Sequence, residues 1–153
     1  MIVIFGADGS PQSQHAIREA ARLMPLKDAE LFAVAVTSLA MPPIDIGVAG
    51  MAAVSTVSQT MMLDQSDAAV HRQLDVTLGL FAELGLRVTP VERTGDPGDE
   101  LLRVAQELKA DLIVVGSHGH GPIARLIKGS VADRMTHHAA AAVLVVHMPG
   151  FEG

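Results

Sequence analysis

The chain has 153 residues, of which 49% are hydrophobic, enough for one domain with a single core and too apolar for a disordered protein. A formal charge of −6 and the absence of Trp and Tyr argue against nucleic-acid or anionic-membrane partners, because the chain has neither a basic field nor aromatic stacking platforms. The absence of cysteine excludes disulfides, thiol catalysis and thiolate metal sites.

The first half of the chain alternates apolar runs with helical patterns. Residues 2–5 read as a buried strand, and Ser10 and Pro11 then supply an N-cap and a first helical residue. Residues 31–36 form a second apolar run, which is typical of a strand covered on both faces in a parallel sheet. Residues 39–57, rich in Pro, Gly, Ala and Met, predict a long connection without a clear period.

The second half repeats the alternation, with a second capping pair at Asp96 and Pro97. The expected elements are a helix at 58–84, a strand at 86–92, a helix after Asp96, a strand at 112–115, a helix at 130–138 and a strand at 142–146. This βαβαβαβαβ order predicts an α/β three-layer sandwich with a five-stranded parallel sheet, Rossmann-like in architecture. The last strand is expected at one edge of that sheet.

Two loops follow strands at places that suit a ligand. In open parallel sheets, ligands bind beyond the carboxyl ends of the strands. One such loop is Gly6-Ala7-Asp8 after the first strand, and the other is the glycine-rich segment that begins at Gly116. If the first and fourth strands are neighbours, both loops face one crevice.

The glycine-rich segment fails two common phosphate-binding patterns. A P-loop needs Gly-Lys followed by Ser or Thr, whereas here the order is Lys128-Gly129-Ser130. The dinucleotide pattern G-x-G-x-x-A is met at 119–124, but on the fourth strand and with a proline in its turn. What remains is G-x2-G-x9-G-[ST] from Gly116 to Ser130, between a strand and a helix.

This spacing resembles the signature of the ATP-binding branch of the universal stress protein family. Gly116 to Gly119 and Gly129 to Val131 match it without insertion or deletion, and Asp8, Gly95-Asp96-Pro97 and the apolar last strand extend the resemblance over the whole chain. The resemblance implies one domain over residues 1–153 with the fold called adenine nucleotide alpha hydrolase-like. Ala132 is a departure, since a hydroxyl side chain is frequent there in the family.

The resemblance also implies that ATP, with or without Mg²⁺, lies across the crevice. Asp8 would accept hydrogen bonds from the nucleoside, Gly6 and Ala7 would form the adjoining wall, and Val36 would flank adenine. The remaining contacts would come from the signature itself: Gly116, Ser117, His118 and Gly119 around the ribose and phosphates, and Gly129, Ser130, Val131 and Ala132 at the phosphates. A helix start suits an anion because its N–H groups are unpaired and its dipole is positive there.

Other interpretations stay open from the residues alone. Asp8 can serve only as a cap for the turn before the first helix, and residues 116–121 can form only a tight connection. The histidine pairs at 118 and 120 and at 137 and 138 have no carboxylate at ligand spacing beside them, so no metal site is expected.

The resemblance implies a nucleotide-dependent sensor or adaptor in a stress response, with an unidentified protein partner. No general base is recognisable for the γ-phosphate, so no catalytic residue is assigned, although slow ATP hydrolysis or autophosphorylation is left open. The alternatives are an oligomeric interaction module with an empty crevice and a phosphoryl-transfer enzyme. The family pairs its last strand across a two-fold axis, which implies a homodimer through residues 142–147.

A cytoplasmic location is expected from two further patterns. No basic residue precedes the apolar run at the start of the chain, as it would in a secretory signal. No apolar stretch reaches the length that a membrane-spanning helix needs.

Overall fold

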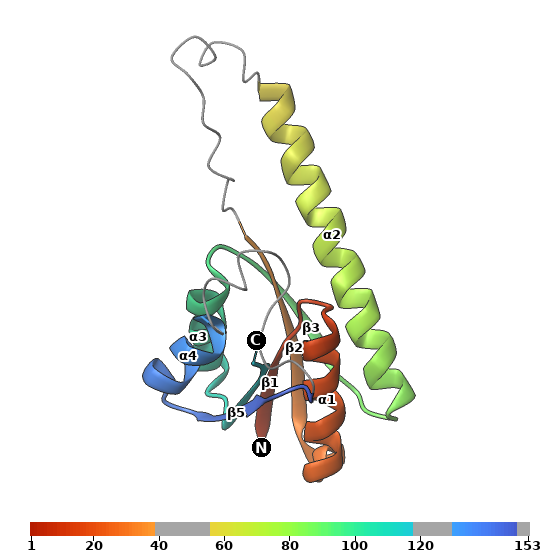
Figure 1. The fold of residues 1–153 in the computed structure, drawn as a ribbon, viewed down its shortest axis with the longest axis vertical. Helices are drawn as coiled ribbons and strands as arrows, with labels where there is room; N and C mark the ends of the chain where they lie inside the picture. The colour runs from red at the N-terminus through yellow and green to blue at the C-terminus, as the bar shows by residue number, and fades with distance from the viewer. Residues whose placement is uncertain (39–55, 118–129, 150–153) are drawn as a thin grey trace.

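The computed structural model describes residues 1–38, 56–117 and 130–149, with the backbone alone at 56–66 and 130. Within these ranges the elements are β1 (Ile2–Gly6), α1 (Pro11–Leu23), the short 3-10 helix η1 (Leu26–Asp28), β2 (Glu30–Thr37), α2 (Thr56–Glu83), β3 (Thr89–Thr94), α3 (Pro97–Leu108), β4 (Leu112–Gly116), α4 (Ser130–His138) and β5 (Ala142–Val146). The strands form one parallel sheet in the order β3-β2-β1-β4-β5 (Figure 1). The expected element order and the α/β fold class are confirmed.

None of the helices in the described ranges is long and apolar enough to cross a membrane.

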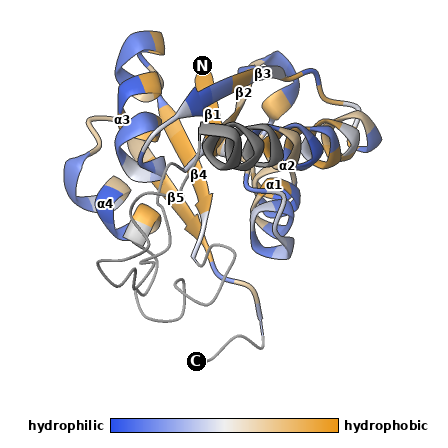
Figure 2. Ribbon diagram, turned by 90° about the horizontal axis from the view of Figure 1, so that it is seen from above, coloured by the Kyte–Doolittle hydropathy of each residue, from blue (hydrophilic) through white to orange (hydrophobic). Residues whose placement is uncertain are grey.

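Helices cover both faces of the sheet. Figure 2 shows α1 and α2 on one side of the apolar strands and α3 and α4 on the other. Successive strand residues point to opposite faces, so Val3 and Phe5 of β1 belong to the apolar cluster under α1 and α2. Ile4 between them belongs to the cluster under α3 and α4. The three-layer arrangement predicted from the order of elements is therefore present.

Two helices begin at the caps that the sequence predicts. The Ser10 hydroxyl oxygen accepts a hydrogen bond from the N–H of Ser13 at 3.1 Å, and Pro11 is the first residue of α1. The Asp96 carboxylate accepts from the N–H of Asp99 at 3.0 Å in the same way, at the start of α3. Each cap closely follows the carboxyl end of a strand, so both helices start at the edge of the sheet where ligands bind in this class of fold.

The third strand differs from its predicted range of 86–92. It begins at Thr89 and ends at Thr94. Leu86 and Val88 pack instead against the apolar cluster under α1 and α2, and the N–H of Leu86 donates to the carbonyl of Phe81 at 2.9 Å. Their hydrophobicity thus belongs to the connection after α2, and the strand boundaries read from it are wrong.

The two edges of the sheet have different sequences. β3 reads TPVERT and carries Pro90, Glu92 and Arg93, which are residues that discourage further strand pairing. The N–H of Gly95 donates to the carbonyl of Thr37 in β2, so by alternation the backbone nitrogen of Pro90 faces away from β2. β5 reads AVLVV and has no charge. The prediction that the last strand is an edge strand is confirmed.

Candidate functional site

The topology brings the two predicted loops together. β1 pairs with β2 on one side and with β4 on the other, so the loop after β1 and the segment after β4 leave neighbouring strand ends. The sheet also changes its direction of winding between β1 and β4. Such a switch point is where open α/β sheets place their ligands.

Buried polar side chains gather at the same edge. Of the described residues, the buried polar or charged ones are Ser10, Gln12, Ser13, Thr37, Thr77, Glu100 and Ser117. All except Thr77 lie at or just beyond the carboxyl end of a strand. Ser10, Ser13 and Glu100 form hydrogen bonds at the starts of α1 and α3, so they shape the edge of the sheet where ligands bind in this class of fold.

Contacts of the backbone at Ala7 and Gly9 fix the position of the loop after β1. The N–H of Ala7 donates to the carbonyl of Val34 at 2.8 Å, and Ala7 is buried. Gly9 has a φ of +69°, and a Cβ atom at this position would lie 3.0 Å from Cγ of Gln73 in α2. A side chain at Gly9 would therefore be both strained and crowded. These contacts fix the course of the chain on either side of Asp8.

Asp8 performs the capping role that the sequence left as an alternative. Its Oδ1 accepts a hydrogen bond from the N–H of Ser10 at 2.9 Å, and the residue is half-buried. Within the described residues its other carboxylate oxygen makes no hydrogen bond. Capping therefore uses one oxygen of Asp8 and leaves the second for another donor.

The end of β4 packs tightly on α1. A Cβ atom on Gly116 would lie 3.0 Å from the carbonyl carbon and oxygen of Gln12. The next residue, Ser117, is buried, and its N–H donates to the carbonyl of Val146 at 2.9 Å. The absence of a side chain at Gly116 thus allows the backbone of β4 to lie close to the backbone of α1. Gly6, at the end of β1, has a looser environment, with Val115 3.3 Å from such an added atom.

Some of the other predicted site residues lie in the part of the chain that the structure describes, and the rest do not. Val36 and Val131 are half-buried and Ala132 is buried, and all three belong to the apolar cluster under α3 and α4. Ser130 is the first residue of α4. His118, Gly119 and Gly129 lie outside the described residues. Ala132, where the resemblance led us to expect a hydroxyl side chain, is therefore part of the core.

Sequence reasoning missed Gln12 and Arg134. Gln12 is only 9% exposed, and its place four residues before buried Ala16 on the apolar stripe of α1 could have revealed its burial. Nη1 of Arg134 in α4 donates to Asp96 and to Asp99, each at 2.7 Å. This bridge ties α4 to the start of α3, and no local sequence pattern signals a contact between such distant residues.

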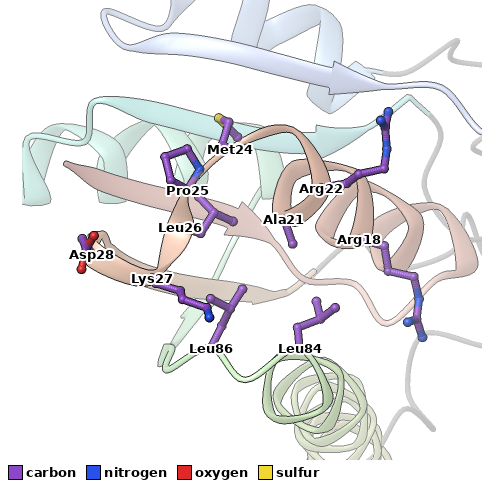
Figure 3. Close-up of a pocket in the computed structure, with 10 residues that line it drawn as sticks. All are labelled: Arg18, Ala21, Arg22, Met24, Pro25, Leu26, Lys27, Asp28, Leu84 and Leu86. Carbon is purple, nitrogen blue, oxygen red and sulfur yellow. The ribbon is translucent and has the colours of Figure 1, made fainter.

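A separate hollow lies at the amino end of the sheet. It has a volume of about 500 Å³ and lies between the end of α1, η1 and the chain that leaves α2 (Figure 3). Leu26, Leu84 and Leu86 contribute apolar side chains, while Arg18 and Arg22, which also line it, form ion pairs with glutamates. No predicted site residue lines this hollow, so the candidate site remains the carboxyl edge.

Comparison with known proteins points to one family. The sequence model of the Universal stress protein family matches residues 1–147. A universal stress protein of Methanocaldococcus jannaschii is 29% identical over 147 residues, which are 96% of this chain and 82% of that protein. The solved structure of the universal stress protein UspA from Lactobacillus plantarum has a TM-score of 0.75 at 20% identity, and the match covers 95% of this chain and 97% of that one.

Two of the similar solved structures are nucleotide complexes. A universal stress protein in complex with cAMP has a TM-score of 0.57 and is 26% identical, over 96% of each chain. A universal stress family protein from Arabidopsis thaliana with AMP bound has a TM-score of 0.69 at 16% identity, over 99% of this chain and 94% of that one. At that lower identity the likeness shows the shared fold.

Proposed function

This chain belongs to the universal stress protein family, and we propose that it binds an adenine nucleotide, foremost ATP, at the carboxyl edge of its sheet. The observation that carries the proposal is the pairing of β1 with β4, which puts the Asp8 loop beside the Gly116 end of the signature. The cAMP and AMP complexes of similar proteins support the ligand class.

The proposed contacts follow from the chemistry of each part of the crevice. The second carboxylate oxygen of Asp8 accepts from the nucleoside, next to the wall formed by Gly6 and Ala7, and Val36 flanks the base. The phosphates lie at the start of α4, where Ser130, Val131 and Ala132 offer backbone N–H groups and a positive helix dipole. At Ala132 the contact is through the backbone alone, because its side chain is in the core.

The rest of the phosphate contacts are proposed from the signature alone. Gly116 and Ser117 lead from β4 into it, and His118, Gly119 and Gly129 complete it in the sequence. Mg²⁺ would arrive with the nucleotide, as a counter-ion to its phosphates. We assign no catalytic residue, so the proposed role is a nucleotide-dependent stress sensor or adaptor, in which any ATP hydrolysis is slow.

We also propose a homodimer through the last strand, residues 142–147, and a cytoplasmic location. The contrast between the two sheet edges supports the dimer, since β3 carries Pro and charges whereas β5 is apolar and uncharged. The same edge favours a second candidate function, an oligomeric interaction module in which the crevice is empty.

Two measurements separate these functions, and a variant tests the proposed site. Mass spectrometry of the small molecules released from the purified protein should find an adenine nucleotide, and calorimetric titration with ATP, AMP and cAMP should rank the three. Gly119→Val should abolish ATP binding while far-UV circular dichroism stays that of a folded α/β domain. A protein that carries no nucleotide and binds none of the three would overturn the proposal in favour of the interaction module.

A further inference from the structure

Gln12 carries a buried acceptor that the described part of the protein does not satisfy. The side chain lies at the second position of α1 and is 9% exposed. Its Oε1 is fully buried, and among the described residues no donor hydrogen-bonds to it. Buried polar atoms in proteins almost always have a partner, so an orphaned one calls for a missing group.

The nearby buried polar side chains are satisfied, which sets Gln12 apart. The hydroxyl of Ser10 accepts from the N–H of Ser13, and the hydroxyl of Ser13 donates back to the carbonyl of Ser10 at 3.0 Å. Nε2 of Gln14, on the same turn, donates to the carbonyl of Gly9 at 3.1 Å. The unsatisfied atom is therefore a property of Gln12 and not of the whole turn.

The place of Gln12 is the proposed site itself. Its backbone and Cβ atom lie within 3.0 to 3.2 Å of the position that a Cβ atom on Gly116 would occupy. Gly116 ends β4, and the turn that holds Gln12 follows the Asp8 loop directly. Gln12 thus lies where the two halves of the crevice meet.

We propose that Gln12 is a specificity-determining residue of this site, which uses its buried amide oxygen to accept a hydrogen bond from the ligand. The inference rests on the proposed nucleotide function. As the structure orients the amide, its buried oxygen can only accept, and nucleotide phosphates are mostly deprotonated at neutral pH, so they are poor donors. The matching group is therefore on the nucleoside, either a ribose hydroxyl or the amino group of adenine.

A buried acceptor makes a site selective. When a ligand lacks the matching donor, the acceptor stays unpaired in a place that water cannot fill freely, and the analogue binds more weakly than the parent. Three analogues of ATP separate the sources of the donor: 2′-deoxy-ATP, 3′-deoxy-ATP and purine riboside triphosphate, which lacks the amino group.

The test is calorimetric titration of the full chain with ATP and these three analogues. Wild-type protein should bind one analogue about 10-fold more weakly than ATP, since that is the scale of one hydrogen bond to a buried group. Gln12→Met keeps the shape of the side chain without the acceptor. It should bind ATP about 10-fold more weakly and lose the discrimination against that analogue, whereas Gln106→Met on the exposed face of α3 should retain both.

The possible failures are distinguishable. If wild type binds ATP and all three analogues equally, the role of Gln12 is overturned without any variant. If Gln12→Met folds poorly, Gln12→Leu, which also lacks the acceptor, takes its place in the same comparison. If Gln12→Met folds and discriminates as wild type does, the role is overturned and nucleotide binding stands. If wild type binds none of the four, both proposals fall.

Discussion

Gly116 at the end of β4 lies against Gln12 in the first turn of α1, with 3.0 Å between the Gln12 carbonyl and the place of a Cβ atom on Gly116. Because the atoms that would clash are backbone atoms, they cannot move without shifting α1 or β4. We expect Gly116→Ala to lower the free energy of unfolding by about 1–3 kcal/mol in urea denaturation.

A matched substitution separates crowding from the effect of alanine itself. At Gly79 in α2 an added Cβ atom meets none of the described atoms within 4 Å. Gly79→Ala should therefore raise the free energy of unfolding by about 0.5–1 kcal/mol, through helix propensity and a less flexible unfolded chain. Similar changes at both positions would contradict the packing argument.

Asp8 has two carboxylate oxygens with different expected roles, and two substitutions separate them. Asp8→Ala removes the bond to the Ser10 N–H and the proposed nucleoside contact. It should lower the stability of the free protein by about 1 kcal/mol and weaken ATP binding by about 10- to 100-fold. Asp8→Asn keeps a neutral acceptor for Ser10, so the free protein should unfold as wild type does while ATP binds more weakly.

Urea denaturation of the free protein and calorimetry with ATP measure the two effects separately. If Asp8→Ala loses stability but holds its ATP affinity, Asp8 is a turn cap and takes no part in the site.

The backbone of β5 allows a sharp test of the proposed dimer. The N–H of Ala142 donates to the carbonyl of Asp111 just before β4, and the carbonyl of Val146 accepts from the N–H of Ser117 just after it. By alternation, the backbone groups of Val143 and Val145 therefore face the free edge. Val145→Pro should convert a dimer into a monomer in light scattering and keep the pairing of β4 with β5. Val145→Thr retains the N–H and should stay dimeric. A wild-type monomer at micromolar concentration would refute the dimer.

Arg134 should stabilise the packing of α4 on α3 in a salt-dependent way. Its guanidinium meets both Asp96 and Asp99, but the side chain is 40% exposed, so the gain is that of a surface pair. Arg134→Met should lower the free energy of unfolding by about 0.5–1 kcal/mol at low salt, and less at 1 M salt. Arg22→Met, which breaks an exposed pair with Glu19 inside α1, is the control for losing one ion pair within a helix.

His71 links α2 to β3 in a pH-dependent way. Its pKa is raised above the ordinary 6.5, first by the hydrogen bond with the Asp67 carbonyl and then by Glu92, with smaller contributions from the charges of Asp67 and Asp75. A raised pKa means that the charged form stabilises the fold fully below pH 6.5 and that this contribution is lost as pH rises through the folded-state pKa.

An NMR titration of the imidazole should show this raised pKa. Glu92→Gln should lower it only in part, because the Asp67 carbonyl remains. If Glu92→Gln leaves the pKa of His71 unchanged, the contact between α2 and β3 does not form in solution.

Local chemistry made much of this fold predictable. Ser10 and Asp96 were predictable as caps because short polar side chains before a proline accept hydrogen bonds from N–H groups of the first helical turn, and both caps are present. The boundaries of β3 could not be predicted from the sequence. Leu86 and Val88 are apolar because they pack against the core beneath α2, and they are not part of the strand. Here tertiary packing overrides the local pattern.

The candidate site was predictable to the extent that it follows from topology. Asp8 and Gly116 were expected at one edge on the condition that the first and fourth strands are neighbours, and β1 does pair with β4. The buried oxygen of Gln12 depends on the packing of α1 against the end of β4. The spacing of Gln12 and Ala16 could indicate that Gln12 is buried, but the close approach of Gly116 to Gln12 leaves no trace in the spacing of residues.

The uncharged edge at β5 also limits how two copies could communicate. In a parallel pair the two strands do not bond equivalently, so identical edges related by a two-fold axis can pair only in antiparallel fashion. The carboxyl ends of the two half-sheets would then point in opposite directions. In such a dimer, two ligands at the carboxyl edges would lie at opposite ends of the assembly, out of direct contact with each other.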